Sequence, residues 1–346
     1  MTTFSFLDDY SEGAHPAILR ALTDSNFAQH GPYGDDAFSA QAAQRIRAHL
    51  GEQFDGAIHF VPTGTMANLV SIASCLRPHE AVIAVASGHI VGKETGAIEA
   101  TGHKIIVVPP VNGKLTPQNI ETALAGNAHF PHMARPRLLY VSNATETGTV
   151  YTLAELQAIS ALAKQRGLIL FIDGARLGAA LASSKNDATL ADIAALADIF
   201  WIGGTKLGAL LGEAIVVSNP ALKQDFAFHI KQRGGLLAKG RLLGIQFQEL
   251  FGDDPLFFTL ARHANAMAAK LALGITARGY TLSSETETNQ LFPILPNSVI
   301  SELQKQFAFY VWEKSGDEHS VIRLVTSWAT EERQVDAFLA ALTPAL

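Results

Sequence analysis

The sequence contains very little cysteine and little charge. Cys75 is its only cysteine, so the chain can form neither an internal disulfide nor a zinc site built from cysteines. A reducing compartment, the cytoplasm, is therefore the simplest expectation. Charged residues make up 17% of the 346 residues, below the roughly 25% that is typical of soluble domains. We expect another subunit to cover much of the surface.

Long apolar runs and basic stripes are also missing. Even the apolar segment 190–201 is interrupted by Asp192 and Asp198, and no run approaches the ~18 residues that a membrane-spanning helix needs. The N-terminus turns acidic at Asp8 and lacks the basic start of a signal peptide. With 26 Lys and Arg against 32 Asp and Glu, the formal net charge is −6. We expect no binding to membranes or to nucleic acids.

Several common catalytic motifs are absent as well. The chain has no G-x-G-x-x-G, no G-x-x-x-x-G-K-[ST], no G-x-S-x-G and no H-E-x-x-H. Their absence counts against nicotinamide binding, P-loop hydrolysis, lipase-type catalysis and zincin chemistry. No metal site is expected.

What the sequence does have is an alternation of short apolar runs with helical patterns. Thr116-Pro117 is typical of a helix start, and Thr152 with Glu155 forms a capping box. Strand and helix in alternation predict an α/β fold with a doubly wound, mainly parallel sheet. The expected strands, each suited to burial on both faces, are 57–61, 81–85, 104–108, 138–141, 168–172, 199–202 and 214–217.

The pattern changes after Pro220 to long helices rich in Ala and Leu, followed by a mixed segment. We predict two domains: residues 1–250, an N-terminal segment plus a large cofactor-binding domain, and residues 251–346, a small C-terminal α+β domain. The small domain is expected to contain strands near 307–312 and 321–325 and a final helix from Thr330.

Three short segments carry candidate chemistry. Asp173 and Arg176 follow the most apolar strand, at the sheet edge where open α/β sheets bind ligands, although Asp173 alone could simply cap a helix. Lys206 lies in a glycine-rich turn after the next strand, where burial would favour the neutral amine, although an exposed loop lysine is the alternative. Gly64 and Thr65 lie between a strand and a helix, where free N–H groups would suit a phosphate, although taken alone the segment is better explained as an ordinary strand-to-helix turn.

Together these segments match the needs of pyridoxal 5′-phosphate (PLP). A lysine can bind its aldehyde, an acid can keep the pyridine nitrogen protonated, and a helix N-terminus can hold its phosphate. The combination is far more specific than any one of its members.

The sequence resembles the L-threonine aldolase and β-eliminating lyase family of PLP enzymes, which have an aspartate-aminotransferase-like fold. The resemblance covers nearly the whole chain and implies a homotetramer in which a neighbouring subunit completes each active site. The segments that carry it are 8–13, Tyr33-Gly34-Asp35-Asp36, 62–68, the region of His89, Asp173-Gly174-Ala175-Arg176, 203–208 and 322–326.

The resemblance implies a role for each matching residue. Lys206 would bind the cofactor covalently, Asp173 would pair with the pyridine nitrogen, Arg176 would contact the ring's 3-oxygen and His89 would stack on the ring. Without the resemblance, His89 reads as a core histidine. The residues expected to bind the phosphate are Gly64, Thr65 and Thr205. Substrate binding would involve Ser11 and Arg323, as a clamp on the carboxylate, and Tyr33 from the partner chain.

Two segments depart from the family pattern. Many members have Asn-Thr-His-Asn where this chain has Asn143-Ala144-Thr145-Glu146, so a second histidine that would face the substrate hydroxyl is missing. The usual Gly-Gly-Gly-Met-Arg-Gln stretch appears at 233–240 without its arginine in place. Arg233 and Lys239 are the candidates to replace this cross-subunit contact to the phosphate.

The activity implied is cleavage of L-β-hydroxy-α-amino acids, such as threonine, allo-threonine or phenylserine, to glycine and an aldehyde, with low specificity at the β-carbon. A β-eliminating lyase or an aminotransferase using the same cofactor is the alternative. A third possible function is that of a non-catalytic cofactor-binding protein. This alternative is disfavoured because Asp173, Lys206 and Arg323 are all present.

Overall fold

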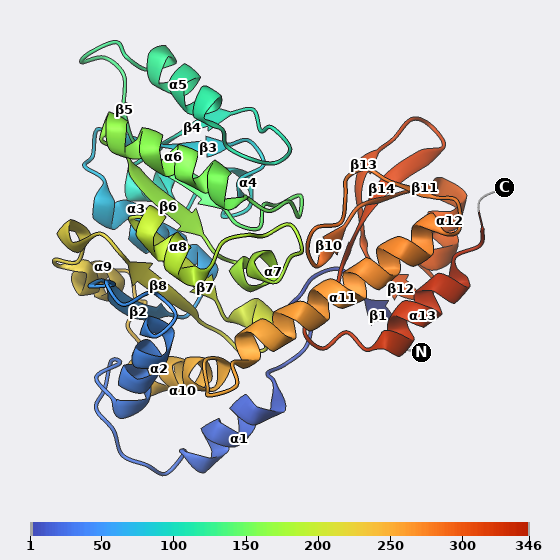
Figure 1. Ribbon diagram of the computed structural model, residues 1–346, viewed down its shortest axis with the longest axis horizontal. Coiled ribbons are helices and arrows are strands. Elements are labelled where there is room, and N and C mark those ends of the chain that lie inside the picture. The colour runs from blue at the N-terminus through green and yellow to red at the C-terminus, as the bar shows by residue number, and fades with distance from the viewer. Residues whose placement is uncertain (1–2, 345–346) are drawn as a thin grey trace.

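A computed structural model describes residues 3–344 of the chain. A seven-stranded sheet forms its larger part, with the strand order β2-β8-β7-β6-β5-β3-β4 (Figure 1). All neighbouring pairs are parallel except the two made by β8, which is antiparallel to β2 and β7. The predicted fold class is confirmed. The strands are β2 (Ala57–Val61), β3 (Glu80–Val85), β4 (Lys104–Val108), β5 (Arg135–Ser142), β6 (Ile169–Asp173), β7 (Ile199–Gly203) and β8 (Glu213–Val217).

Helices cover both faces of this sheet. One buried cluster packs α2 (Ala37–Arg47), α5 (Pro117–Gly126), α6 (Leu153–Arg166), α8 (Leu190–Leu196) and α10 (Arg241–Leu250) on one face. A second cluster packs α3 (Gly64–Cys75), α4 (His89–Gly92) and α9 (Phe226–Gln232) on the other. Burial on both faces explains why each strand reads as a continuous apolar run.

The predicted helix starts are confirmed at α5 and α6. Thr152 Oγ1 accepts from the backbone N–H of Glu155 at 3.2 Å, and Glu155 Oε2 accepts from the N–H of Thr152 at 2.8 Å. Thr116 forms an equivalent capping box with Asn119, and Pro117 is the first residue of that helix. These contacts satisfy N–H groups that have no partner inside the helix.

The smaller part begins along α11 (Leu256–Thr276), which Figure 1 shows crossing from the large sheet to the C-terminal layer. Its own apolar cluster includes Phe6, so the N-terminal segment packs with the C-terminal part; β1 (Phe4–Ser5) pairs in parallel with β12. The predicted boundary between residues 250 and 251 stays a prediction. The other elements here are β9 (Thr281–Leu282), β10 (Gln290–Leu291), β11 (Pro293–Pro296), α12 (Asn297–Leu303), β12 (Phe307–Ala308), β13 (Tyr310–Lys314), β14 (His319–Val325) and α13 (Glu332–Ala341).

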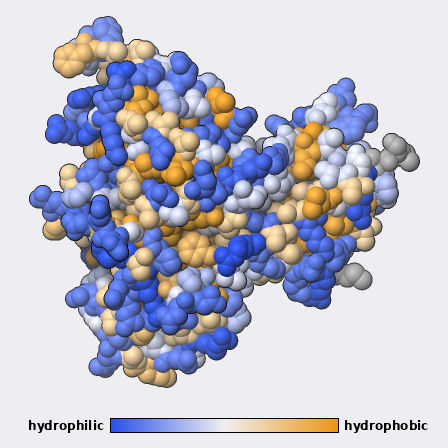
Figure 2. All heavy atoms as spheres, viewed as in Figure 1, coloured by the Kyte–Doolittle hydropathy of each residue, from blue (hydrophilic) through white to orange (hydrophobic). Residues whose placement is uncertain are grey.

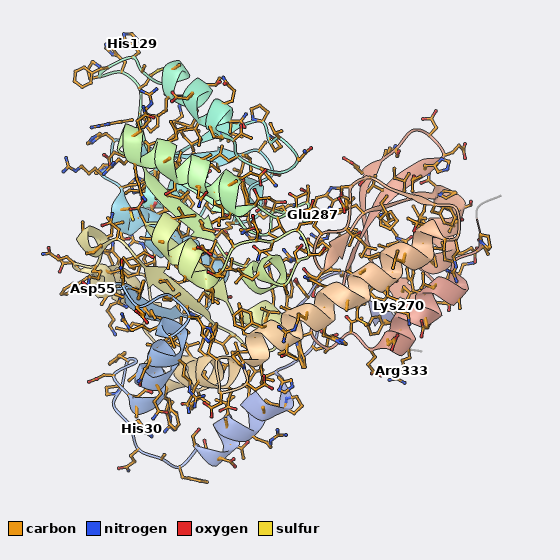
Figure 3. The ribbon with its side chains drawn as sticks, viewed as in Figure 1. His30, Asp55, His129, Lys270, Glu287 and Arg333 are labelled. Atoms are coloured by element: carbon orange, nitrogen blue, oxygen red, sulfur yellow. The ribbon has the colours of Figure 1, made fainter. Side chains whose placement is uncertain are left out.

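The two parts contact each other beside a hollow, which the surface in Figure 2 shows between them. Glu287 lies at this junction (Figure 3), where its Oε2 accepts from the N–H of Val150 at 2.7 Å and its carbonyl accepts from Ser183. No helix within residues 3–344 is long and apolar enough to cross a membrane. The short helices not yet described are α1 (Pro16–Asp24), α7 (Leu177–Leu181) and the 3₁₀ turns η1 (Glu99–Thr101), η2 (Thr205–Leu207) and η3 (Pro220–Leu222).

Candidate active site

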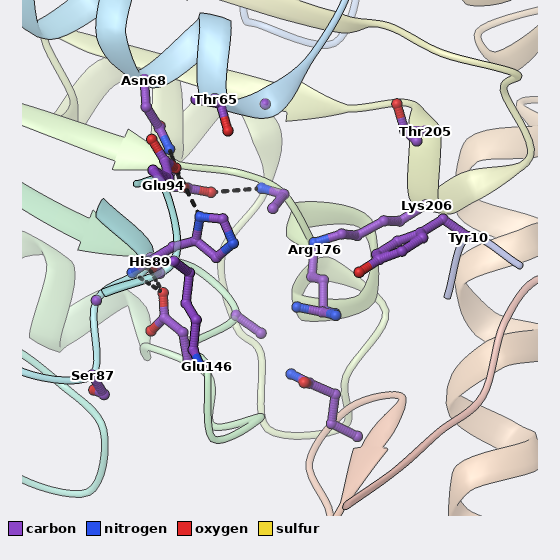
Figure 4. Close-up of a pocket in the computed structure, with 18 of the residues that line it drawn as sticks. Tyr10, Thr65, Asn68, Ser87, His89, Glu94, Glu146, Arg176, Thr205 and Lys206 are labelled. Atoms are coloured by element: carbon purple, nitrogen blue, oxygen red, sulfur yellow. Dashed lines mark hydrogen bonds and ion pairs between the residues drawn. The ribbon is translucent and has the colours of Figure 1, made fainter. Parts of the chain in front are cut away.

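A cavity of about 930 Å³ lies at the carboxyl ends of the parallel strands and extends to β13 and β14. Figure 4 shows His89 and Glu94 on one side of it, with Lys206 and Tyr10 on the other. Eight of the residues predicted from the sequence line this cavity. They are Gly64, Thr65, His89, Asp173, Arg176, Thr205, Lys206 and Arg323.

The N-terminus of α3 forms one wall. Thr63 caps the helix by accepting from the N–H of Met66 at 3.2 Å, which leaves the N–H groups of Gly64 and Thr65 available. A Cβ at Gly64 would lie only 2.8 Å from Cη2 of Trp201, so the close approach of β7 requires glycine here. The wall therefore offers backbone donors and the positive end of a helix to an anion.

Asp173 ends β6 and is held from several sides. Its Oδ2 accepts from Tyr140 Oη at 2.6 Å and from Asn68 Nδ2 at 2.9 Å, and its Oδ1 accepts from the N–H of Ala175 at 2.9 Å. Burial, followed by the charge of Asp173, raises the pKa of Tyr140, which keeps the phenol protonated as a donor. A carboxylate with this support can accept one more N–H, as a protonated pyridine requires.

Asn68 is a site residue that the sequence reading did not single out. Its Nδ2 donates to Asp173 and, at 2.6 Å, to Oε1 of Glu94, while its Oδ1 accepts from the indole of Trp201 at 3.0 Å. It lies four residues after Gly64 in the segment already noted, so helix periodicity places it below the N-terminal turn of α3.

Glu94 in turn orients His89. The Nδ1 atom of His89 lies 2.7 Å from Glu94 Oε1, whose side chain is fully buried, whereas the imidazole is 44% exposed. Donation of the Nδ1 proton to the carboxylate leaves Nε2 as an acceptor. The ring therefore faces the cavity in a form suited to take up a proton.

Lys206 lies in η2, directly after β7. Burial, then the charge of Arg176, lowers the pKa of Lys206, so the reactive neutral amine is more populated than in water. Its Nζ lies 6.0 Å from the centre of the Tyr10 ring. Tyr10 was also missed; it neighbours the predicted Ser11.

Thr205, expected to bind phosphate, is already engaged in the protein. Its Oγ1 donates to Oε1 of Glu213 at 2.9 Å and accepts from the N–H of Gly212 at 3.1 Å. Glu213 also accepts from the N–H of Gly204 at 2.9 Å, and burial raises the pKa of Glu213 to about 7. The signal that could have revealed Glu213 is an acid placed immediately before the apolar run of β8.

Arg176 forms a two-pronged ion pair. Its Nε and Nη2 donate to Asp9 at 2.7 and 3.0 Å, and Asn289 Nδ2 also donates to Asp9 at 2.8 Å. Burial alone would raise the pKa of Asp9, but the charges of Arg176 and Lys206 outweigh it and the pKa lies below its usual range. Asp9, a residue to which the sequence analysis gave no role, therefore holds Arg176 in place in the cavity lining.

Arg323 extends from β14 into the cavity. Its Nη2 donates to the carbonyl of Leu7 at 3.0 Å, and its guanidinium lies 5.0 Å from the ring centre of Tyr310 and 5.2 Å from that of Trp312. Within the part of the chain that the structure describes, its buried Nε has no hydrogen-bond partner. A guanidinium that lies over two aromatic rings and keeps an unpaired donor is suited to a carboxylate.

Glu146 stands beside His89. Its Oε1 accepts from the N–H of His89 at 2.9 Å and from Ser142 Oγ at 2.7 Å, and burial raises the pKa of Glu146. In the segment that departs from the family pattern, an acid therefore positions the backbone of His89.

Other predicted residues lie outside this cavity. Ser11 is exposed and donates to Asp8 at 2.9 Å. Tyr33 lines a separate cavity of about 260 Å³, with Lys231 Nζ 4.0 Å from its ring centre. Arg233 is half-buried and Lys239 is exposed, and neither belongs to the cavity lining. The single chain does not bring these four to Lys206.

The residues present fit PLP. The cavity combines an amine with a lowered pKa, a carboxylate fixed at the end of β6 and an anion-binding helix start. Ser87 adds a buried hydroxyl at the cavity wall that has no partner among residues 3–344. This donor set matches the aldehyde, the ring nitrogen and the phosphate of that group.

Comparison with known proteins gives one consistent result. Residues 8–297 match the family model described as beta-eliminating lyase. A low specificity L-threonine aldolase from Pseudomonas sp. is 34% identical over 336 residues, which cover 95% of this chain and 94% of that protein. The threonine aldolase of Leishmania major is 50% identical with a TM-score of 0.96 and covers 98% of both chains. An aspartate aminotransferase from Thermus thermophilus, 14% identical with a TM-score of 0.68 over 98% of this chain and 90% of that one, shares the fold.

Proposed function

The chain belongs to the β-eliminating lyase family, and from this premise we propose that it cleaves L-β-hydroxy-α-amino acids of the threonine type to glycine and an aldehyde. The enzyme is PLP-dependent, as its family and fold relatives are. The observation that carries the proposed reaction is a single cavity that joins Lys206, Asp173 and Arg323 with the His89–Glu94 pair.

Each residue has a task in this reaction. When bound, PLP supplies the electron sink that allows a bond at the substrate's Cα to break. Lys206 would hold the cofactor, and Asp173 would keep the proton on its pyridine nitrogen. Arg323 would hold the substrate carboxylate and so turn the Cα–Cβ bond perpendicular to the ring, the orientation that selects this bond for cleavage.

His89 is the proposed base for the β-hydroxyl proton. Its Nε2 faces the cavity while Glu94 holds Nδ1 at 2.7 Å, which is the arrangement of a general base with an orienting carboxylate. Loss of the hydroxyl proton drives formation of the aldehyde. Elimination or transamination would need no base at this hydroxyl, so His89 favours the aldol reaction.

We propose a homotetramer in the cytoplasm. Large apolar side chains of the N-terminal segment lie open to solvent in the single chain, with Leu19 45%, Phe27 95% and Tyr33 45% exposed. A second subunit would cover them and bring Tyr33, Arg233 or Lys239 to its neighbour's site. Sedimentation equilibrium tests the assembly, and the single thiol of Cys75 is compatible with a reducing compartment.

The reaction is tested with L-threonine, L-allo-threonine and L-phenylserine in a coupled assay for aldehyde, with the visible absorbance of the bound cofactor recorded in parallel. We expect the absorbance band, glycine and an aldehyde. Pyruvate, ammonia or a keto acid instead of an aldehyde would move the function to elimination or transamination. Full activity and an unchanged band in Lys206→Ala would refute the role of Lys206.

A further inference from the structure

Glu213 is a buried acid that lines the cavity beside Thr205, a residue expected to bind the phosphate. It is 4% exposed, begins β8 and holds the loop that carries Lys206 through Gly204 and Thr205. Thr65, in the first turn of α3, and Thr205 both line the cavity, and Figure 4 draws them on the same side of it. Glu213 therefore lies behind a hydroxyl that lines the same cavity as the N-terminus of α3.

The charges facing Glu213 do not neutralise it. Across residues 3–344, no Lys, Arg or His nitrogen lies within 4.0 Å of its carboxylate. The neighbouring strands β2 and β7 place Val61 and Gly203 opposite it, and α3 contains no charged side chain. Two charges oppose each other at this carboxyl: that of Lys206 favours the carboxylate, and that of Asp173 disfavours it.

The hydrogen-bond pattern creates a conflict when a phosphate arrives. When Glu213 is ionised, both of its oxygens can only accept hydrogen bonds. The single hydroxyl proton of Thr205 is then donated to the carboxylate. The N–H of Gly212 occupies an acceptor position of the same hydroxyl. Thr205 would then present only the remaining lone pair of its oxygen to an anion, with a second anion, the Glu213 carboxylate, behind it.

We propose that Glu213 is a proton switch for cofactor binding: protonated Glu213 donates to Thr205 Oγ1, and the Thr205 hydroxyl turns its own proton to the phosphate of PLP. One proton is taken up from solvent at the Glu213 carboxylate, and no covalent bond changes at this residue. The chain of donors then runs in one direction, from Glu213 through Thr205 to the phosphate. Burial favours the same neutral state, since it raises the pKa of Glu213.

The inference rests on the PLP assignment and is independent of which amino acid is cleaved. Binding that takes up a proton becomes weaker as the pH rises, by up to about tenfold per pH unit above the pKa of the free site. Pyridoxal, which lacks the phosphate, provides the control because it condenses with Lys206 without needing the switch. At pH 8 the phosphate itself is already almost fully ionised, as its second pKa is about 6.

The test is calorimetric titration of the apoprotein at pH 8 with PLP and with pyridoxal, each in two buffers of different ionisation enthalpy, which counts the protons taken up. We expect PLP to take up on the order of one proton more than pyridoxal. Glu213→Gln should abolish this difference, whereas Glu94→Gln, another buried acid of the cavity, should keep it. Thr205→Val should weaken the binding of PLP but not that of pyridoxal. Thr205→Ser, which keeps the hydroxyl, should bind PLP as the unmodified protein does.

Equal proton uptake for the two compounds in the unmodified protein would overturn the switch, even if Glu213→Gln failed to fold. A difference that persists in Glu213→Gln would overturn it as well. Failure of both compounds to bind would instead overturn the PLP assignment, and the inference with it, so the two failures are distinguishable.

Discussion

His89 and Glu94 form a hydrogen-bonded pair, with Nδ1 and Oε1 2.7 Å apart, and the same carboxylate oxygen accepts from Asn68. Because Asn68 also donates to Asp173, one amide group joins the partner of the proposed base to the expected partner of the cofactor ring. The two ends of the proposed chemistry therefore share one buried network.

The first prediction concerns the orientation of His89 by Glu94. Glu94→Ala should lower kcat by about 10²-fold with a smaller change in KM, since the ring loses the acceptor that fixes its tautomer. Glu94→Gln should lower kcat less than Glu94→Ala does, because the amide oxygen of the glutamine can still accept a hydrogen bond from Nδ1 of His89. Nitrogen NMR of the apoprotein checks the cause: His89 should carry its proton on Nδ1 in the unmodified protein and populate both tautomers in Glu94→Ala. An unchanged tautomer would contradict the assignment.

The second prediction concerns the stability that Asn68 provides. Asn68→Ala leaves the Trp201 indole and two carboxylates without their shared partner, and it should lower the free energy of unfolding by about 1–3 kcal/mol. Ser71, one turn further along α3, is the matched control. Its buried hydroxyl has no partner among the described residues, so Ser71→Ala should change stability little. Denaturant unfolding at one protein concentration measures the free energy of unfolding of both variants. Equal losses of this free energy in the two variants would show that the Asn68 network does not stabilise the fold.

The main sheet and several helix starts were predictable because their signals are local. Apolar runs mark strands buried on both faces, and Thr152 with Glu155 specifies a helix start within four residues. The resemblance to the family is likewise confirmed. The positions of Lys206 and Asp173 in the cavity lining were predictable because each lies at the carboxyl end of a strand, the edge where such sheets bind ligands.

The supporting residues were not predictable in this way. Asn68 meets Asp173 across 105 positions of the chain, and Arg176 meets Asp9 across 167. Such pairs are set by tertiary packing, and one sequence carries no local sign of them. For Thr205 the predicted phosphate role was inferred without Glu213, whose importance depends on its burial and not on a motif.

A third prediction tests Arg323 as the carboxylate clamp. Arg323→Lys should raise KM by roughly 10–100-fold, because the lysine loses the planar pair of donors and the stacking on Tyr310 and Trp312. Binding of PLP should change little. The control is Arg333→Lys, since Arg333 lies on the surface (Figure 3) and pairs with its near neighbour Glu331. Loss of PLP binding with unchanged KM would place Arg323 at the cofactor and remove it from substrate binding.

The last prediction concerns acid stability and His59. Burial lowers the pKa of His59 from 6.5 to about 4, its ring stacks on Phe226 with centres 5.0 Å apart, and its buried Nε2 has no partner among the described residues. The unfolded chain binds a proton at this residue below pH 6.5, whereas the folded chain binds it only near pH 4. The unfolding free energy should therefore fall as the pH drops from 6.5 toward 4, by about 3 kcal/mol for this residue over the whole range.

Replacing His59 by Phe should remove this dependence while keeping the stacked ring. Urea unfolding at pH 7.5 and pH 5.0, at fixed protein concentration, should show a loss on acidification that is smaller in His59→Phe by about 2 kcal/mol. At pH 7.5 the variant should be as stable as the unmodified chain or more so, because the substitution removes a buried nitrogen that has no partner. His129→Gln, at an exposed loop position visible in Figure 3, should lose as much unfolding free energy on acidification as the unmodified chain. An equal loss in His59→Phe would mean that His59 protonates without cost, for instance because subunit association gives Nε2 a partner.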